Sequence, residues 1–161
     1  MLKVQNKSTK RIRVIQIIVF LIQIFLTSQP FVWGGAIFPQ FKKNTFTVLD
    51  MISYIGTQSS DVKVTSTLTT IGLCYILFLV IPVVAVAFQI FDREYNLKNI
   101  VGIICSFAGV LAIIYLVGPQ YLCFASMISL LLYLFSAFMS VMGIFARFLK
   151  TDDKKTDDNK K

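Results

Sequence analysis

Histidine is absent from this 161-residue sequence, and cysteine occurs only three times. The cysteines, Cys74, Cys105 and Cys123, lie in apolar runs and form no CxxC pair. Zinc sites are built from Cys, His and carboxylate ligands, and disulfide frameworks need several paired cysteines. The sequence therefore predicts neither a metal centre nor a disulfide scaffold. We expect the cysteines to serve as small buried apolar residues.

Charged residues are scarce as well, and they are missing from long stretches of the chain. They make up 15% of the residues, whereas 56% are hydrophobic and the mean hydropathy is +0.73. Soluble domains carry roughly 25% charged residues. The stretch from Asn99 to Ala146 contains no charge and is interrupted only at Gly118 and Pro119, which is too long for one helical crossing of a ~30 Å hydrocarbon core. We therefore predict an all-α integral membrane protein without a sizeable soluble domain.

The hydrophobic runs predict a four-transmembrane-helix bundle. The predicted spans comprise residues 14–33, 65–91, 99–117 and 121–148. A basic N-terminus (residues 1–13) precedes the first span, and a charged tail (149–161) follows the last. A cytoplasmic turn (92–98) and an outer turn (118–120) connect the second, third and fourth spans. From Thr151 onward the tail has balanced charges and no apolar residue, which predicts disorder.

The largest predicted connection is an extracytoplasmic segment at residues 34–64. Within it, residues 47–56 place Val48, Ile52 and Ile55 on one helical face, and Gly56 offers a C-terminal stop. We predict a short amphipathic helix there that caps the bundle, with partner binding as the alternative. The chain start also resembles a signal peptide; we favour an uncleaved anchor, with cleavage of residues 1–36 as the alternative.

The distribution of Lys and Arg predicts the orientation of the spans. Of the 16 basic residues, only Lys42, Lys43 and Lys63 fall in the predicted outer segment, and the others flank the opposite ends of the spans. By the positive-inside rule both termini are predicted to be cytoplasmic. The small size and the lack of an N-glycosylation acceptor in the outer segment favour a bacterial plasma membrane. The basic residues before the first span predict contact with anionic lipid rather than with nucleic acid.

No Asp, Glu, Lys, Arg or His lies in the apolar run of any predicted span. Buried carboxylates, histidines or metal ligands would be needed for proton-coupled exchange, for metal or aspartyl proteolysis, and for His-assisted serine chemistry. We therefore predict a protein that is not an enzyme and that has no cofactor.

Polar residues inside the first span are candidates for contacts between helices. Gln16 and Gln23 are seven residues apart on one helical face, and Thr27 lies four residues further along it. An amide in a bilayer needs a hydrogen-bond partner, and such interhelical bonds contribute on the order of 0.6 to 2 kcal/mol each. We expect a seam that holds the first helix to its own bundle; the alternative is a polar stripe that lines a solute path or a subunit interface.

Small residues mark the third and fourth predicted helices. Gly102 pairs with Ser106, and Cys105 with Gly109, at spacings of four residues that allow another helix to approach closely. The fourth helix carries a similar face, formed by Ser136, Ser140 and Gly143. We expect these two faces to pack on each other, whereas an exposed face would imply a second subunit.

Pro82 lies in the middle of the second predicted span, where it removes one helical hydrogen bond. A simple kink is the expected consequence, and a gating hinge is the alternative.

Three functions remain open from the sequence, and the least favoured is a membrane enzyme in which Ser, Tyr or Cys acts without a conventional partner or a partner subunit supplies the missing groups. The first is an accessory or scaffold subunit of a membrane complex, which would have a membrane-protein partner. The second is a small homo-oligomeric channel or transporter for a weakly polar solute, with Gln16, Gln23, Thr27 and Pro82 along its path.

Overall fold

The computed structural model describes the backbone of residues 7–33, 44–57, 72–92 and 97–158. Most of the predicted outer segment, the centre of the cytoplasmic turn and the chain ends therefore lie outside the described residues. Among predicted side chains, Ile55 also lies outside the described set.

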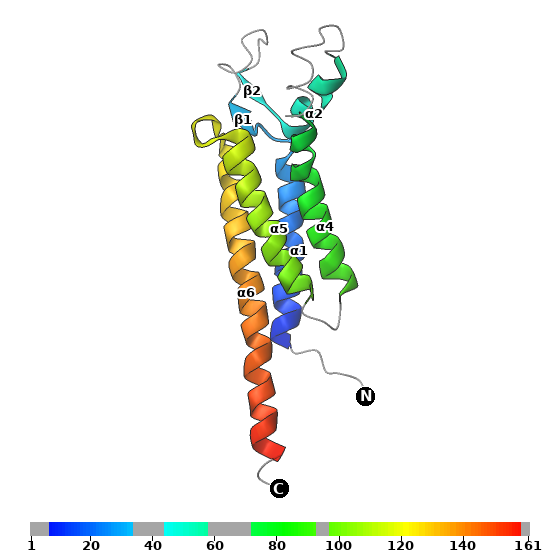
Figure 1. The fold of residues 1–161 in the computed structure, drawn as a ribbon, viewed down its shortest axis with the longest axis vertical. Helices are drawn as coiled ribbons and strands as arrows, with labels where there is room; N and C mark the ends of the chain where they lie inside the picture. Colours follow the sequence, from blue (N-terminus) through cyan, green and yellow to red (C-terminus); the bar gives the residue numbers. More distant parts are fainter. Residues whose placement is uncertain (1–6, 34–43, 58–71, 93–96, 159–161) are drawn as a thin grey trace.

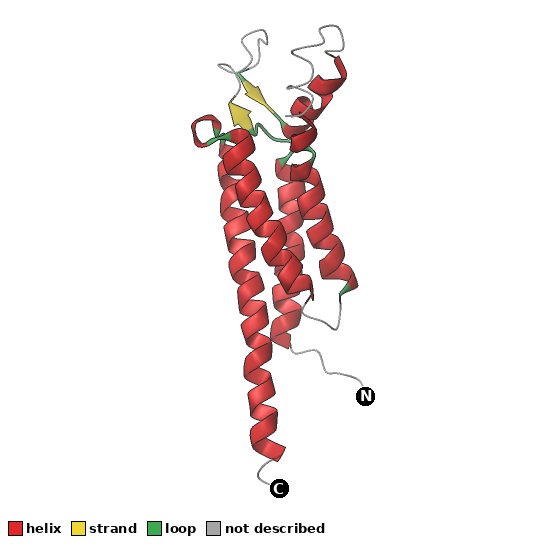
Figure 2. Cartoon of the chain, viewed as in Figure 1, coloured by secondary structure: helices red, strands yellow, loops and turns green. Residues whose placement is uncertain are grey.

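The described chain is mostly helical, and three helices are long and apolar enough to cross a membrane (Figure 2). These are Gly72–Phe91, Leu97–Val117 and Phe124–Phe145. Each provides at least 20 residues, or ~30 Å at 1.5 Å per residue. The prediction of a helical protein with membrane-capable segments is therefore confirmed.

Four long helices pack side by side in a bundle. They are α1 (Lys7–Leu26), α4 (Leu77–Phe91), α5 (Leu97–Ala112) and α6 (Phe124–Asp158). α1 packs against α4 and α6, and α5 packs against the same two helices. α1 begins and α6 ends at the same end of the bundle, which we call the terminal end (Figure 1).

The first predicted span differs from the structure at both ends. α1 begins at Lys7 and takes in Lys10, Arg11 and Arg13, so its apolar part is shorter than those of the other helices. It ends at Leu26, whereas the sequence predicted a span up to residue 33. The following Thr27 and Ser28 hydroxyls donate back to carbonyls of the last turn, and Pro30 lacks the N–H that a longer helix would need.

The residues after α1 form a small antiparallel sheet at the other end of the bundle, which we call the sheet end (Figure 1). β1 (Val32–Trp33) pairs with β2 (Thr45–Phe46), and Val32 also bridges to Leu122 ahead of α6. This sheet places the connection between α5 and α6 beside the end of α1.

α2 (Val48–Thr57) lies within one residue of the predicted amphipathic helix. Thr47 and Asp50 form a reciprocal cap, because the Asp50 N–H donates to Thr47 Oγ1 at 2.9 Å and the Thr47 N–H donates to Asp50 Oδ2 at 3.0 Å. Val48 and Met51 are buried in the core, and the Val48 N–H donates to the Thr27 carbonyl at 3.1 Å. α2 therefore covers the sheet end of the bundle.

The connection from α5 to α6 is a tight turn at the position predicted from Gly118 and Pro119. A π-helical turn, Ile113–Val117, ends at Gly118, whose φ of 78° is the only positive φ among the described residues. Such a φ favours glycine because it has no Cβ. A 3-10 turn, Pro119–Tyr121, then leads into α6.

The predicted disordered tail is helical as far as Asp158, because α6 continues without a break from its apolar part. Extending a helix that is already nucleated adds one hydrogen bond per residue and avoids the cost of a new nucleus. The composition of the tail alone does not indicate this stabilisation, because it comes from the helix that precedes the tail.

Candidate functional site: the polar interior of the bundle

A set of polar side chains is buried in the interior of the described bundle, and we call this set the polar interior. It includes Gln16, Gln23, Thr27, Gln89, Asn99, Ser106, Ser126, Ser129, Ser136 and Ser140. All four helices contribute to it. Six of these residues, Gln16, Gln23, Thr27, Ser106, Ser136 and Ser140, are candidates from the sequence, and the structure buries each of them.

Gln16 is the centre of the first hydrogen-bond layer. Its side chain is 1% exposed, and its Nε2 donates to Ser140 Oγ at 2.6 Å. Its Oε1 accepts from Gln89 Nε2 at 2.8 Å, and the same Nε2 contacts the Lys98 carbonyl at 3.4 Å. One amide therefore joins α1 to α4 and α6, and Gln89 extends the layer to the start of α5.

Arg13 holds the end of α4 next to this layer. Its guanidinium donates to the carbonyls of Gln89 at 2.5 Å and Ile90 at 2.9 Å. The last carbonyls of a helix have no partner within the helix, and they carry partial negative charge. Arg13 satisfies two of them and complements their charge.

Gln23 forms a second layer nearer the sheet end. Its Nε2 donates to the Ser129 carbonyl at 3.3 Å, and its Oε1 accepts from Ser129 Oγ at 2.7 Å. Thr27 follows the end of α1 on the same buried side, but its hydroxyl donates to the Ile24 carbonyl in the last turn of α1 at 2.7 Å. The three polar residues predicted on one face of α1 therefore have separate partners.

Small residues set the contact between α5 and α6 at three levels. A Cβ added to Gly102 would lie 2.5 Å from Ser140 Oγ, and one added to Gly143 would lie 2.9 Å from Asn99 Oδ1. A Cβ added to Gly109 would lie 2.4 Å from the Tyr133 ring. The two small-residue faces thus pack against each other, as the sequence predicted.

The three contacts share one antiparallel register. Moving seven residues along α5, from Gly102 to Gly109, moves the contact seven residues back along α6, from Ser140 to Tyr133. The same register sets Ser106 level with Ser136. Both hydroxyl oxygens, and Gln89 Oε1, are fully buried and have no hydrogen-bond partner among the described residues.

Pro82 is buried within α4 but takes no part in these hydrogen bonds, and the helix continues on both sides of it. Its carbon ring offers no donor to the amide layers. Of the sequence candidates, Pro82 belongs neither to the polar interior nor to the glycine contacts between α5 and α6.

Four residues of the polar interior were not predicted from the sequence, and neither was Tyr133, which packs against Gly109. Ser126, Ser129 and Tyr133 continue the spacing of three and four residues that leads to Ser136 and Ser140, so the predicted face of α6 could have been extended toward its start. Gln89 and Asn99 flank the charged turn, where polar residues are common. The neighbouring sequence therefore does not indicate that these two side chains are buried. These residues are Gln89, Asn99, Ser126, Ser129 and Tyr133.

The polar interior offers hydrogen bonds from neutral groups. Among the described residues no cluster of three His, Cys, Asp or Glu side chains is placed to hold a metal ion. Cys74, Cys105 and Cys123 are free thiols. The arrangement therefore supports packing and the binding of neutral polar groups.

Comparison of the chain with protein-family models, with curated proteins and with solved structures finds no match. Evidence for the function therefore comes from the geometry of the polar interior and of the surrounding surface.

Proposed function

We propose that this protein is an accessory or scaffold subunit of a membrane complex. The observation that carries this proposal is that Gln16, Gln23 and Ser140 are hydrogen-bonded within a single chain. A bundle whose amides are used to hold its own helices together is suited to a structural role. Its outward surface is left to lipid and to other proteins.

We further propose that all four bundle helices span a bacterial plasma membrane with both termini in the cytoplasm. Support comes from α1, which packs against two membrane-capable helices, α4 and α6. Lys10 and Arg11 are exposed at the terminal end, where they would meet anionic lipid. The excess of basic residues at that end favours a cytoplasmic location.

Single-cysteine variants test this orientation. In a chain whose three native cysteines are replaced by alanine, Gln120→Cys is expected to react with a membrane-impermeant maleimide in intact cells. Lys10→Cys is expected to react only after permeabilisation. Both native residues are exposed, so reagent access is matched. Labelling of Lys10→Cys alone in intact cells would reverse the proposed topology.

The subunit proposal predicts a defined complex in the native membrane. The protein, extracted from its own membrane in mild detergent, is expected to migrate with at least one other membrane protein in a fixed ratio. Native mass measurement with identification of the co-purifying chains checks this result. Membranes that lack the tagged chain provide the control for background capture. A protein that migrates alone would contradict the proposal.

The alternative is a small channel or transporter for a weakly polar solute. It is favoured by the three unpartnered buried oxygens, on Gln89, Ser106 and Ser136, because water or a neutral solute satisfies such groups. The path would run inside one bundle, since Gln16 and Gln23 face its interior. Solute flux into vesicles reconstituted with the purified protein and no other chain would favour this alternative.

A further inference from the structure

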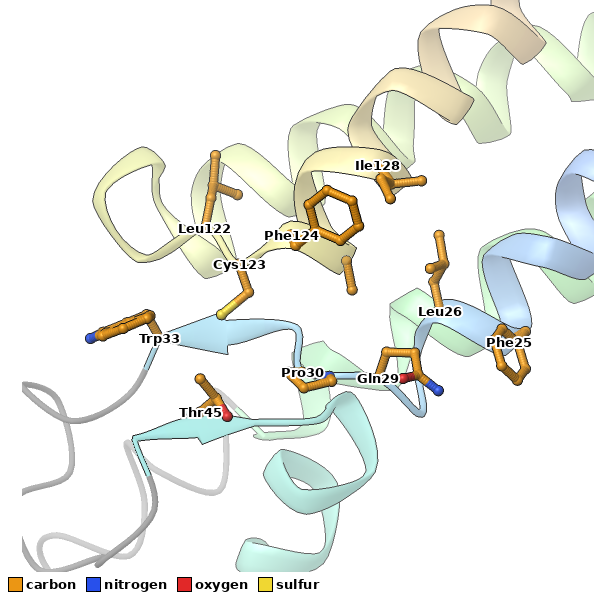
Figure 3. A pocket seen from close by; sticks show the side chains of 11 residues that line it. Phe25, Leu26, Gln29, Pro30, Trp33, Thr45, Leu122, Cys123, Phe124 and Ile128 are labelled. Atoms are coloured by element: carbon orange, nitrogen blue, oxygen red, sulfur yellow. The ribbon is translucent and has the colours of Figure 1, made fainter.

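An apolar groove of about 540 Å³ lies at the sheet end of the bundle, between the end of α1 and the start of α6 (Figure 3). Its volume falls within the ~300–1,000 Å³ typical of small-molecule sites. The apolar walls include Phe25, Leu26, Leu122, Phe124 and Ile128. The groove is therefore large enough to hold a ligand and is lined mainly by hydrocarbon.

The groove is continuous with the outward apolar surface of the bundle. Phe124 and Phe25 line it and are 80% and 64% exposed, respectively. The exposed apolar surface continues along α6 through Met127 and Leu131. Because Phe124–Phe145 is long and apolar enough to span a membrane, lipid chains would cover this surface and reach the groove.

The rim next to the sheet is more polar than the walls. Thr45 on β2 and Trp33 on β1 lie on the sheet side, and Gln29 lies between Pro30 and Phe25 near the end of α1 (Figure 3). Amide, hydroxyl and indole groups are suited to the interface between hydrocarbon and headgroups. No Asp, Glu, Lys or Arg is among the described residues that line the groove. The lining thus combines apolar walls with neutral polar groups near the sheet and the end of α1.

We propose that this groove binds one hydrocarbon chain of a bilayer lipid from the leaflet at the sheet end. The chain lies between Phe124, Ile128 and Leu26, and the polar end of the lipid lies toward Gln29 and Thr45. Because the lining is uncharged, the site selects the chain and is indifferent to headgroup charge. This inference is independent of the proposed subunit role.

Lipid retention after delipidation tests the proposal. The full chain is placed in nanodiscs of phosphatidylethanolamine and phosphatidylglycerol, extracted into mild detergent and weighed by native mass spectrometry. Wild type is expected to retain one lipid per chain, with either headgroup. Ile128→Trp fills the groove and is expected to lower retention by roughly tenfold, equivalent to ~1.4 kcal/mol.

Met127→Trp is the matched control, since Met127 is 54% exposed on α6 and does not line the groove. It is expected to retain lipid as wild type does. Phe124→Ala removes a wall without adding bulk, and it is expected to lose lipid as well, which separates a site effect from misfolding of Ile128→Trp. Equal retention by Ile128→Trp and Met127→Trp would overturn the proposal. Dependence on one headgroup, or crosslinking of the groove to a protein, would also overturn it.

Discussion

Gly109→Ala is expected to destabilise the bundle by about 3 kcal/mol, the upper end of the usual cost of overpacking. The added Cβ would lie 2.4 Å from the Tyr133 ring, closer than carbon atoms approach without repulsion. The ring is 1% exposed, so it has no free space to enter. α5 and α6 must then separate, which also disturbs the contact of Gly102 with Ser140. Thermal unfolding in detergent, followed by circular dichroism, measures the loss.

A second substitution distinguishes this clash from a general effect of alanine on α5. Tyr133→Val removes the ring, so Gly109→Ala is expected to cost much less in that background than in wild type. Phe107→Ala, on the exposed side of α5, provides the control for substitution in the same helix. If Gly109→Ala melts at the wild-type temperature, the close α5–α6 contact does not exist in the folded protein.

Gln16→Leu is expected to destabilise the bundle by about 2 kcal/mol. It removes the hydrogen bonds to Ser140 and Gln89 and leaves the Ser140 hydroxyl, already buried, without that partner. Interhelical hydrogen bonds in membranes contribute roughly 0.6–2 kcal/mol each, and orphaned buried groups add ~1–3 kcal/mol. Leucine is close to glutamine in volume, so little cavity cost is included. Unfolding in a series of denaturing-detergent fractions measures the change.

The hydrogen bond between Gln16 and Ser140 also predicts how two substitutions combine. Ser140→Ala removes the same bond from the other side, so the double variant is expected to lose less stability than the sum of the two single variants. Ile18→Leu, on the exposed side of α1, is the control and is expected to stay within ~0.5 kcal/mol of wild type. Strict additivity of Gln16→Leu and Ser140→Ala would show that the two side chains do not interact.

The polar interior was only partly predictable, and the reason differs between residues. The face that carries Gln16 and Gln23 follows from the helical period of one segment. Their partners do not, since Gln16 contacts Ser140 and Gln89 whereas Gln23 contacts Ser129. Partner choice depends on the register between helices that are far apart in sequence, and no local pattern encodes it.

The length and hydropathy of the apolar runs were sufficient to predict a helical protein with membrane-capable segments. Composition alone showed that charged groups are scarce. Helical periodicity indicated α2 and the small-residue faces of α5 and α6. These properties depend on neighbours within a few turns of the same helix. For that reason they can be read from the sequence before any packing is known.

Only the tertiary structure decided where α1 stops and what surrounds its end. The apolar residues after Leu26 look like a continuation of the helix, yet Val32 pairs with Phe46 and bridges to Leu122. These partners come from two distant segments, and Thr45 and Leu122 of those segments line the groove together with residues of α1 and α6. The docking of Tyr133 over Gly109 was decided in the same way, because it exists only when α5 and α6 meet in one register.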